Sequence, residues 1–131
     1  MSTLSRRYTQ SHEWIRLEGK LGYVGISDHA QKEVTDVVYV ELPKIGKVVK
    51  AGEEATTLES VKAAFSIYAP VSGVVAKVNT ALEGDPGLIN KSPYEQGWIF
   101  ALEVENPSEV TGLMTEEQYQ EFLKSGAEAH H

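Results

Sequence analysis

The segment LESVKAAFSIYAP (Leu58–Pro70) contains two short β-type runs that meet at a lysine. Residues 56–60 precede Lys62 and residues 64–68 follow it, and both runs have the composition of strands. The segment therefore predicts a β-hairpin with Lys62 in its turn. Because hairpin turns of this kind protrude from a sheet, we expect the lysine to be exposed to solvent.

The immediate neighbours of Lys62 are small or apolar. Val61 precedes it, Ala63 and Ala64 follow it, and the nearest acid is Glu59. An isolated surface lysine ordinarily serves solubility. Small neighbours on a protruding turn, however, would let a modifying enzyme reach the amine. The arrangement favours covalent attachment of a cofactor.

Further strands are predicted on both sides of the hairpin, at residues 12–17, 21–26, 37–42, 47–50, 73–78 and 97–104. Alternation in the second arm of the hairpin directs Phe65 and Ile67 toward the core. The stretches KIGKVVKAGE (44–53) and PVSGVVAKVN (70–79) resemble each other and bracket the hairpin. They indicate either an internal quasi-repeat or the ordinary reuse of similar turns.

Helix-start signals occur at three places: Ser27–Asp28 with Gln31, Asn106 with Pro107, and Thr115 with Gln118. Residues 79–93 are rich in turn formers and predict a loop with one helical turn. The fold class predicted is mainly β, with short flanking helices and a C-terminal helix.

Length and composition indicate one globular domain. The chain has 131 residues, of which 41% are hydrophobic and 24% are charged. We expect a flexible segment at residues 1–10, a single domain at 11–126, and a flexible tail at 127–131 that resembles a cloning remnant. The protein is expected to be a monomer.

Charge and residue content exclude several functions. A net charge of -7 opposes nucleic-acid binding, and no apolar run is long enough for a membrane helix. The chain has no cysteine, so it has neither disulfides nor a cysteine nucleophile. His12 and His29 alone do not make a zinc site. No catalytic nucleophile with its base is evident, which predicts a protein that is not itself an enzyme.

The stretch ESVKAA (59–64) resembles the lipoylation motif of the glycine cleavage system H protein family. Similar blocks follow the family order along nearly the whole chain: SHEWI (11–15), VGISDHAQ (24–31), DVVYVELPKIG (36–46), YAPVSGVV (68–75), PGLIN (86–90) and PYEQGW (93–98). The resemblance implies a lipoyl/biotinyl-type barrel-sandwich hybrid fold. It also implies lipoate in amide linkage to Lys62, with Glu59, Ser60, Val61 and Ala63 as the recognition motif.

The resemblance further implies a carrier role. A pyridoxal-phosphate-dependent glycine decarboxylase would load an aminomethyl group, a tetrahydrofolate-dependent aminomethyltransferase would remove it, and dihydrolipoyl dehydrogenase would reoxidise the dithiol. A lipoyl-attaching enzyme is the fourth implied partner. We expect the loaded arm to dock near the N-terminal hairpin, where Glu13 would attract the aminomethyl cation. The alternative is that Glu13 is an ordinary exposed acid beside a buried Trp14.

Two positions depart from the family pattern. Family members usually have Ser where this chain has Phe65, and an acid where it has Ser66. The lost acid puts the efficiency of lipoylation in doubt and leaves two alternatives open, an H-like protein that relays lipoate to other enzymes and an unmodified interaction module. A biotin carrier is disfavoured because Val61 and Ala63 replace the expected methionines. The stretches PGLINKSPYE (86–95) and NPSE (106–109) resemble those of mitochondrial members of the family and favour a mitochondrial matrix protein, with the bacterial cytoplasm as the alternative.

Overall fold

Short antiparallel strands make up most of the chain in the computed structural model, which describes residues 6–125. The strands alternate buried and exposed residues wherever one face is covered, as the period of two requires. They are β1 (Arg7–Tyr8), β2 (Glu13–Glu18), β3 (Leu21–Ile26), β4 (Val37–Val40), β5 (Val48–Val49), β6 (Glu54–Ser60), β7 (Ala64–Tyr68), β8 (Gly73–Val78) and β9 (Phe100–Val104).

The helices in the described part of the chain are short. They are α1 (Asp28–Val34), α2 (Ala81–Gly84), α3 (Leu88–Lys91), α4 (Ser108–Thr111) and α5 (Glu116–Lys124). The capping box predicted at Thr115 and Gln118 begins α5, with both reciprocal hydrogen bonds formed. At α1 the N-cap is Ser27, whose hydroxyl accepts from the backbone nitrogen of Ala30. The predicted partner Gln31 instead donates to the side chain of Asp28.

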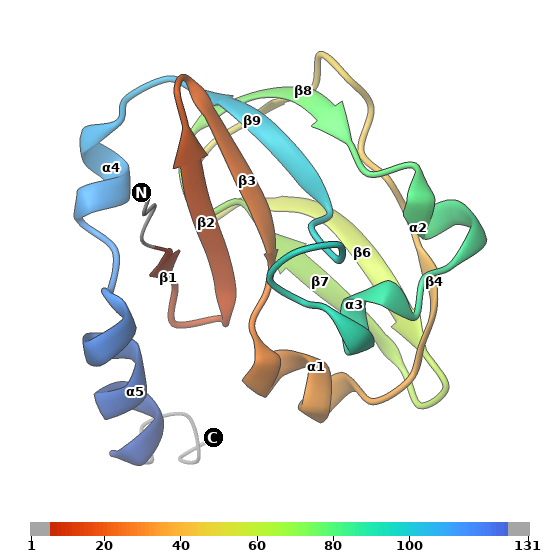
Figure 1. The fold of residues 1–131 in the computed structure, drawn as a ribbon. Helices are drawn as coiled ribbons and strands as arrows, with labels where there is room; N and C mark the ends of the chain where they lie inside the picture. The colour runs from red at the N-terminus through yellow and green to blue at the C-terminus, as the bar shows by residue number, and fades with distance from the viewer. Residues whose placement is uncertain (1–5, 126–131) are drawn as a thin grey trace.

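Two sheets form the layers of the fold. One sheet has the strand order β1-β2-β3-β9-β8-β5, and the other has the order β4-β6-β7. Figure 1 shows α1 and α3 beside each other at the end of the sheets where β6 turns into β7, with α5 next to β1. The mainly β fold class is confirmed, and the two sheets form a sandwich; the described strands do not close into a barrel.

The two similar stretches of sequence meet in the larger sheet. Strand β5 from the first stretch pairs with β8 from the second, with Val48 opposite Val74 and Val49 opposite Gly73. Gly73 is required on the other side of β8, where a Cβ would lie 2.4 Å from the backbone oxygen of Glu103 in β9. The resemblance between the stretches thus corresponds to strands that lie side by side.

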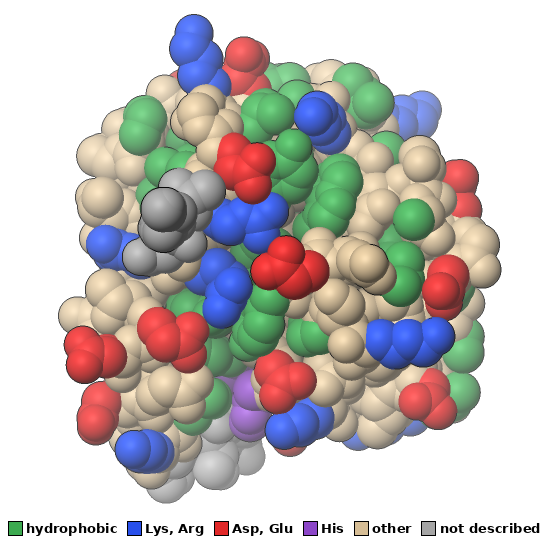
Figure 2. All heavy atoms as spheres, in the orientation of Figure 1, with side chains coloured by type: hydrophobic (Ala, Val, Ile, Leu, Met, Phe, Trp, Pro, Cys, Tyr) green, Lys and Arg blue, Asp and Glu red, His purple; other side chains and the backbone are tan. Residues whose placement is uncertain are grey.

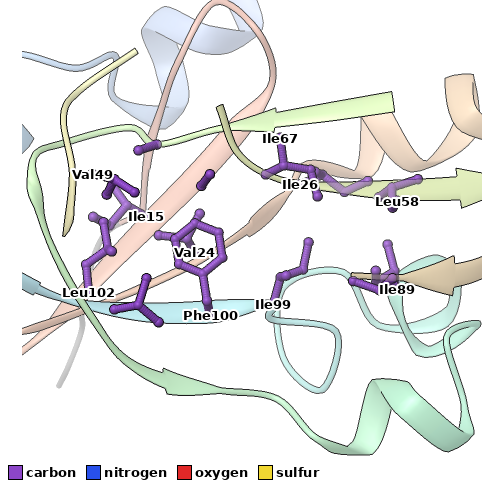
Figure 3. Close-up of a cluster of buried hydrophobic side chains, with 14 of the residues drawn as sticks. Ile15, Val24, Ile26, Val49, Leu58, Ile67, Ile89, Ile99, Phe100 and Leu102 are labelled. Carbon is purple, nitrogen blue, oxygen red and sulfur yellow. The ribbon is translucent and has the colours of Figure 1, made fainter. Parts of the chain in front are cut away.

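The core fills the space between the sheets (Figure 3). Leu58 and Ile67 of the smaller sheet face Ile99 and Phe100 of the larger one, and all four side chains are at most 1% exposed. The prediction that Ile67 is a core residue is confirmed, while Phe65 is only partly buried.

The ordered structure begins before the predicted domain start at residue 11. Arg7 and Tyr8 form β1, and the Tyr8 side chain is only 1% exposed. Tyr8 is held because its ring stacks on Tyr119 of α5, with the ring centroids 4.4 Å apart. Segment 1–10 is therefore not uniformly flexible. The predicted tail, residues 127–131, lies outside the described residues, and the other domain bounds remain a prediction.

Candidate functional site

The turn between β6 and β7 is organised by one side chain. The Ser60 hydroxyl accepts hydrogen bonds from the backbone nitrogens of Lys62 (3.1 Å) and Ala63 (3.2 Å). The backbone nitrogen of Ser60 donates to the carbonyl of Ala63. A serine that bonds to the next backbone groups fixes a tight turn. Ser60, predicted as part of a recognition motif, thus also builds the turn that presents Lys62.

Lys62 lies at the exposed tip of this hairpin, as predicted. Its Nζ donates to the backbone carbonyl of Glu33 in α1, at 2.9 Å. Val61 is 69% exposed, and Glu59 and Ala63 are exposed as well. Residues 59 and 61–63 therefore form one accessible surface, and with the buried Ser60 they make up what we call the hairpin tip (residues 59–63). Lys62 needs to break only one solvent-exposed hydrogen bond to present its amine.

A cavity of about 780 Å³ lies next to the hairpin tip. Its walls come from the start of β2, from α1, from β7 and from α5, and they include Glu13, Ala30, Phe65 and Phe122. Glu33 also lines the cavity, and its carbonyl holds the Lys62 amine. The amine therefore lies at the rim of the cavity, so a flexible group attached to it could fold back inside.

Glu13 lies in the cavity wall but is buried. It is 2% exposed, because alternation places it with Ile15 on the inner face of β2. The interpretation of Glu13 as an ordinary exposed acid is therefore wrong. Its Oε1 accepts from the hydroxyls of Thr9 (2.6 Å) and Ser11 (2.5 Å), and its Oε2 accepts from the backbone nitrogen of Tyr68 (3.0 Å).

Two opposing effects act on the Glu13 carboxyl. Burial raises its pKa above the ordinary value, and the hydrogen bonds from Ser11, Thr9 and the backbone nitrogen of Tyr68 act in the opposite direction. Burial is the larger effect. Glu13 is thus a carboxyl held in a fixed position at the inner end of the cavity, with its oxygens already bonded to the protein.

Both positions that depart from the resemblance line the cavity. Phe65 contributes a partly buried ring, and the hydroxyl of Ser66 donates to Oε1 of Glu54 at 3.1 Å. Ser66 therefore contributes an uncharged hydroxyl to the cavity wall. Phe65 makes that wall more apolar.

Sequence reasoning missed a second buried cluster, which reaches the cavity through Phe122. We call it the aromatic corner: the buried Tyr8, Trp14 and Tyr119 and the side chains packed against them. The Tyr119 hydroxyl bonds to Nδ1 of His12 and to the hydroxyl of Ser27, both at 2.7 Å. Tyr119, Phe122 and Leu123 recur at helical spacing, which indicates an apolar helix face but not the residues that this face meets.

His12 and His29, which the sequence did not indicate as a zinc site, lie next to each other in the structure. Their ring centroids are 4.8 Å apart, and both line the cavity. Figure 2 shows histidine at the surface between α1 and α5, and acidic and basic side chains are interspersed over the same face. His12 also has a backbone φ of 76°, which non-glycine residues rarely adopt. No group of three potential metal ligands occurs among residues 6–125.

The described helices include none that is long and apolar enough to cross a membrane. The site described above thus consists of a protruding amine, an adjacent cavity with apolar and polar walls, and one buried carboxyl at its inner end.

Comparisons with known proteins agree with this geometry. The family model "Glycine cleavage H-protein" matches residues 6–126. A glycine cleavage system H protein from Xanthobacter autotrophicus is 54% identical over 91% of this chain and 95% of its own length. One from Thermotoga maritima is 48% identical over 89% of this chain and 94% of its own length. The crystal structure of a glycine cleavage system H protein from Mycobacterium marinum superposes with a TM-score of 0.84, at 34% identity, and covers 94% of this chain and 99% of that one. The chain therefore belongs to the glycine cleavage H-protein family.

Proposed function

We propose that this protein is the lipoyl-bearing carrier of a glycine cleavage system, with lipoate attached to Lys62. The observation that carries the proposal is the Lys62 amine, exposed on a tight turn at the rim of a cavity. Family membership supports the same assignment.

The residues around Lys62 suit a lipoyl-attaching enzyme. Glu59, Val61 and Ala63 are exposed beside the amine, and Ser60 fixes the turn through its hydroxyl. We propose these four residues as the recognition motif. A rigid turn with small side chains leaves an enzyme free to approach Lys62 without displacing part of the fold.

The cavity fits a lipoyl arm. Its lining combines apolar side chains such as Phe65 and Ile67 with polar groups such as Ser11 and Glu13. When bound, lipoate supplies a dithiol and disulfide pair that takes up the aminomethyl group and is later reoxidised. The protein residues hold the arm against apolar walls, limit the access of water, and place a carboxyl near the amine of the cargo.

Glu13 is proposed to stabilise the cationic cargo by its charge. Direct contact would compete with Thr9, Ser11 and Tyr68 for the carboxylate oxygens. Because these hydrogen bonds keep the carboxylate in place, its field acts on the cavity without rearrangement. If Glu13→Ala leaves the rate of aminomethyl release from the isolated loaded carrier unchanged, this role is excluded.

Four partners follow from the proposal: glycine decarboxylase, aminomethyltransferase, dihydrolipoyl dehydrogenase and the lipoyl-attaching enzyme. The carrier, proposed to be a monomeric single domain with no chemistry of its own, moves a tethered group between active sites. Tethering replaces free diffusion by a high local concentration. The fold supports this role because the hydrogen bonds of Ser60 fix the turn that carries the attachment point.

The named relatives support the bacterial alternative for the compartment. The relatives from Xanthobacter autotrophicus and Thermotoga maritima are bacterial proteins that match nearly the whole chain. The mitochondrial interpretation receives no support from them. We therefore propose that this carrier acts in a bacterial cytoplasm.

The test is intact mass and peptide mapping after incubation with lipoate, ATP and a lipoyl ligase. We expect one lipoyl increment on the peptide that contains Lys62. The increment should be absent in Lys62→Arg and present in Lys44→Arg, a matched variant in another exposed loop. An unmodified Lys62 would exclude the carrier function and favour an interaction module. Modification without acceptance of the aminomethyl group would favour the lipoate relay.

The loss of the acid at residue 66 can be tested in the same assay. If it slows lipoylation, Ser66→Asp should be modified faster than the natural chain by the same ligase. Equal rates would show that the departure at Ser66 does not affect recognition.

A further inference from the structure

One wall of the cavity comes from the C-terminal helix, which is distant in sequence from the hairpin tip. Helix α5 contributes Phe122, whereas the other walls come from residues 10–34 and 58–67. Phe122 is partly buried, and its ring centroid lies 6.2 Å from that of His12, which also lines the cavity. Phe122 is therefore the contribution of α5 to the lining of the cavity.

The position of Phe122 is fixed by Tyr119, one helical turn earlier. Tyr119 is 1% exposed, and residues three apart lie on the same face of a helix. Its hydroxyl contacts the His12 ring nitrogen and the Ser27 hydroxyl, each at 2.7 Å. Because Ser27 is the N-cap of α1, this single hydroxyl joins α5 to the loop before β2 and to the helix that carries Glu33.

A second anchor holds the start of α5. The Tyr8 hydroxyl donates to Oε1 of Glu116 at 2.5 Å, and the Tyr8 ring stacks on Tyr119 with an interplanar angle of 4°. Helix α5 is thus attached at two successive turns, and Phe122 lies beyond both attachments. Phe122 also packs against the buried cluster of Tyr8, Trp14 and Tyr119, which helps to hold it at the cavity.

We propose that Phe122 is a positioning residue that retains the docked lipoyl arm, and that α5 serves as the wall that shields the arm from solvent. This inference rests on the proposed carrier function. The ring would pack against the apolar part of the arm and keep water from the end of the cavity near Glu13. Removing the ring should leave Lys62 and its recognition motif unchanged. The hydrogen bonds that fix the turn and hold the Lys62 amine do not involve α5.

The test measures how fast iodoacetamide alkylates the free lipoyl sulfur of the isolated carrier loaded with the aminomethyl group. The chain contains no cysteine, so this sulfur is the only thiol of the loaded carrier. We expect Phe122→Ala to react about tenfold faster than the natural chain, the change expected when roughly two methylene contacts are lost. Phe122→Leu, which keeps an apolar side chain, should remain within about twofold.

Leu123→Ala is the matched control. Leu123 is the adjacent residue of α5, is also partly buried, and does not line the cavity. We expect its alkylation rate to match that of the natural chain. Equal acceleration in Leu123→Ala and Phe122→Ala would mean that loosening of the helix, and not the Phe122 ring, exposes the arm, and would overturn the assignment.

The outcomes separate this inference from the proposed function. Mass spectrometry establishes lipoylation of Lys62 before the alkylation is measured. A chain without the lipoyl group overturns the proposed function, and this inference with it. A lipoylated chain in which Phe122→Ala reacts at the natural rate overturns only the role of Phe122. Hydrogen exchange of the α5 amides shows whether the helix is still formed in each variant.

Discussion

The hairpin tip and the aromatic corner are built in different ways, although each contacts a residue that lines the cavity: Glu33 accepts a hydrogen bond from Lys62, and Phe122 packs against the corner. The tip consists of five consecutive residues, and its turn is fixed by local hydrogen bonds to Ser60. The corner brings together β1, β2 and α5, so that Tyr8 and Tyr119 meet across more than a hundred residues of sequence. The tip is exposed, and the three central residues of the corner are at most 1% exposed.

The hairpin tip presents the lysine to other proteins, whereas the aromatic corner supports the wall of the cavity. A group that an enzyme must reach gains from exposure and from few contacts, so the tip contributes little to stability. The corner holds the wall of the cavity and must resist displacement, which requires buried area and satisfied polar groups. Substitutions should therefore change modification at the tip and stability at the corner.

The largest effect is expected at Trp14. It is fully buried, and its indole nitrogen donates to the carbonyls of Ile26 and Pro93 at 3.0 Å. Trp14→Ala should lower the free energy of unfolding by about 3–5 kcal/mol, because it leaves a large cavity. Urea denaturation followed by circular dichroism measures this loss. A loss as small as that of a tip variant would contradict the proposed role of the corner.

Tyr119→Phe tests the polar part of the corner while keeping the ring. The variant loses the hydroxyl that bonds to His12 and Ser27. We expect the free energy of unfolding to fall by about 1–3 kcal/mol, since buried polar groups lose a partner. Phe122→Leu serves as a control, because it changes an apolar residue of the same helix without removing a hydrogen bond. Equal stability of Tyr119→Phe and the natural chain would contradict this account.

The ionisation of Glu13 is expected to make the stability of the protein depend on pH. Burial raises the pKa of Glu13, so the folded state keeps the proton to a higher pH than the unfolded state does. The stability contributed by this proton is fully present below the unfolded-state pKa and is lost as the pH rises through the folded-state pKa. Glu13→Gln has no titratable group at this position, so its free energy of unfolding should not show this decrease as the pH rises. Urea unfolding of both proteins from acid to neutral pH measures it, and parallel curves would refute the prediction.

A smaller effect is expected at the start of α5. The Thr115 hydroxyl accepts from the backbone nitrogen of Gln118 at 3.2 Å, and the Gln118 side chain accepts from the backbone nitrogen of Thr115 at 2.9 Å. Thr115→Ala should cost about 1 kcal/mol, the usual loss for an N-cap. Thr115→Ser, which keeps the hydroxyl, should restore most of it. Thermal unfolding distinguishes the two variants.

The smallest effect is expected at the tip itself. Val61 is 69% exposed, so Val61→Ala should change the free energy of unfolding by no more than about 0.5 kcal/mol. Its rate of lipoylation should nevertheless fall, because the proposed recognition surface loses its apolar side chain. A normal modification rate would remove Val61 from the motif, and a large loss of stability would erase the contrast between tip and corner.

Local features of the sequence predicted local features of the structure well. The second arm of the hairpin coincides with β7, and the capping box at Thr115 begins α5 as expected. Alternation correctly directed Ile67 inward, and the same rule applied to β2 would have revealed that Glu13 shares the inner face with Ile15. The N-cap of α1 was predicted less well, because Ser27 and Asp28 are both good capping residues and only the fold selects Ser27.

Loop structure was harder to predict. Residues 79–93 were expected to hold one helical turn, but they contain both α2 and α3. These short helices have no side-chain caps, and their buried residues Leu82 and Ile89 join the main core. Their helical form therefore depends on packing that a sequence window does not contain.

The sequence by itself determined the strands, the hairpin and the exposed lysine, because these depend on alternation, turn chemistry and neighbours within a few residues. Only the tertiary structure decided that Tyr119 bonds to His12 and Ser27, and that Phe122 lines the same cavity as Glu33, whose carbonyl holds the Lys62 amine. Those contacts join residues from both ends of the chain. Their formation depends on how the two sheets and α5 pack together, which no local pattern specifies.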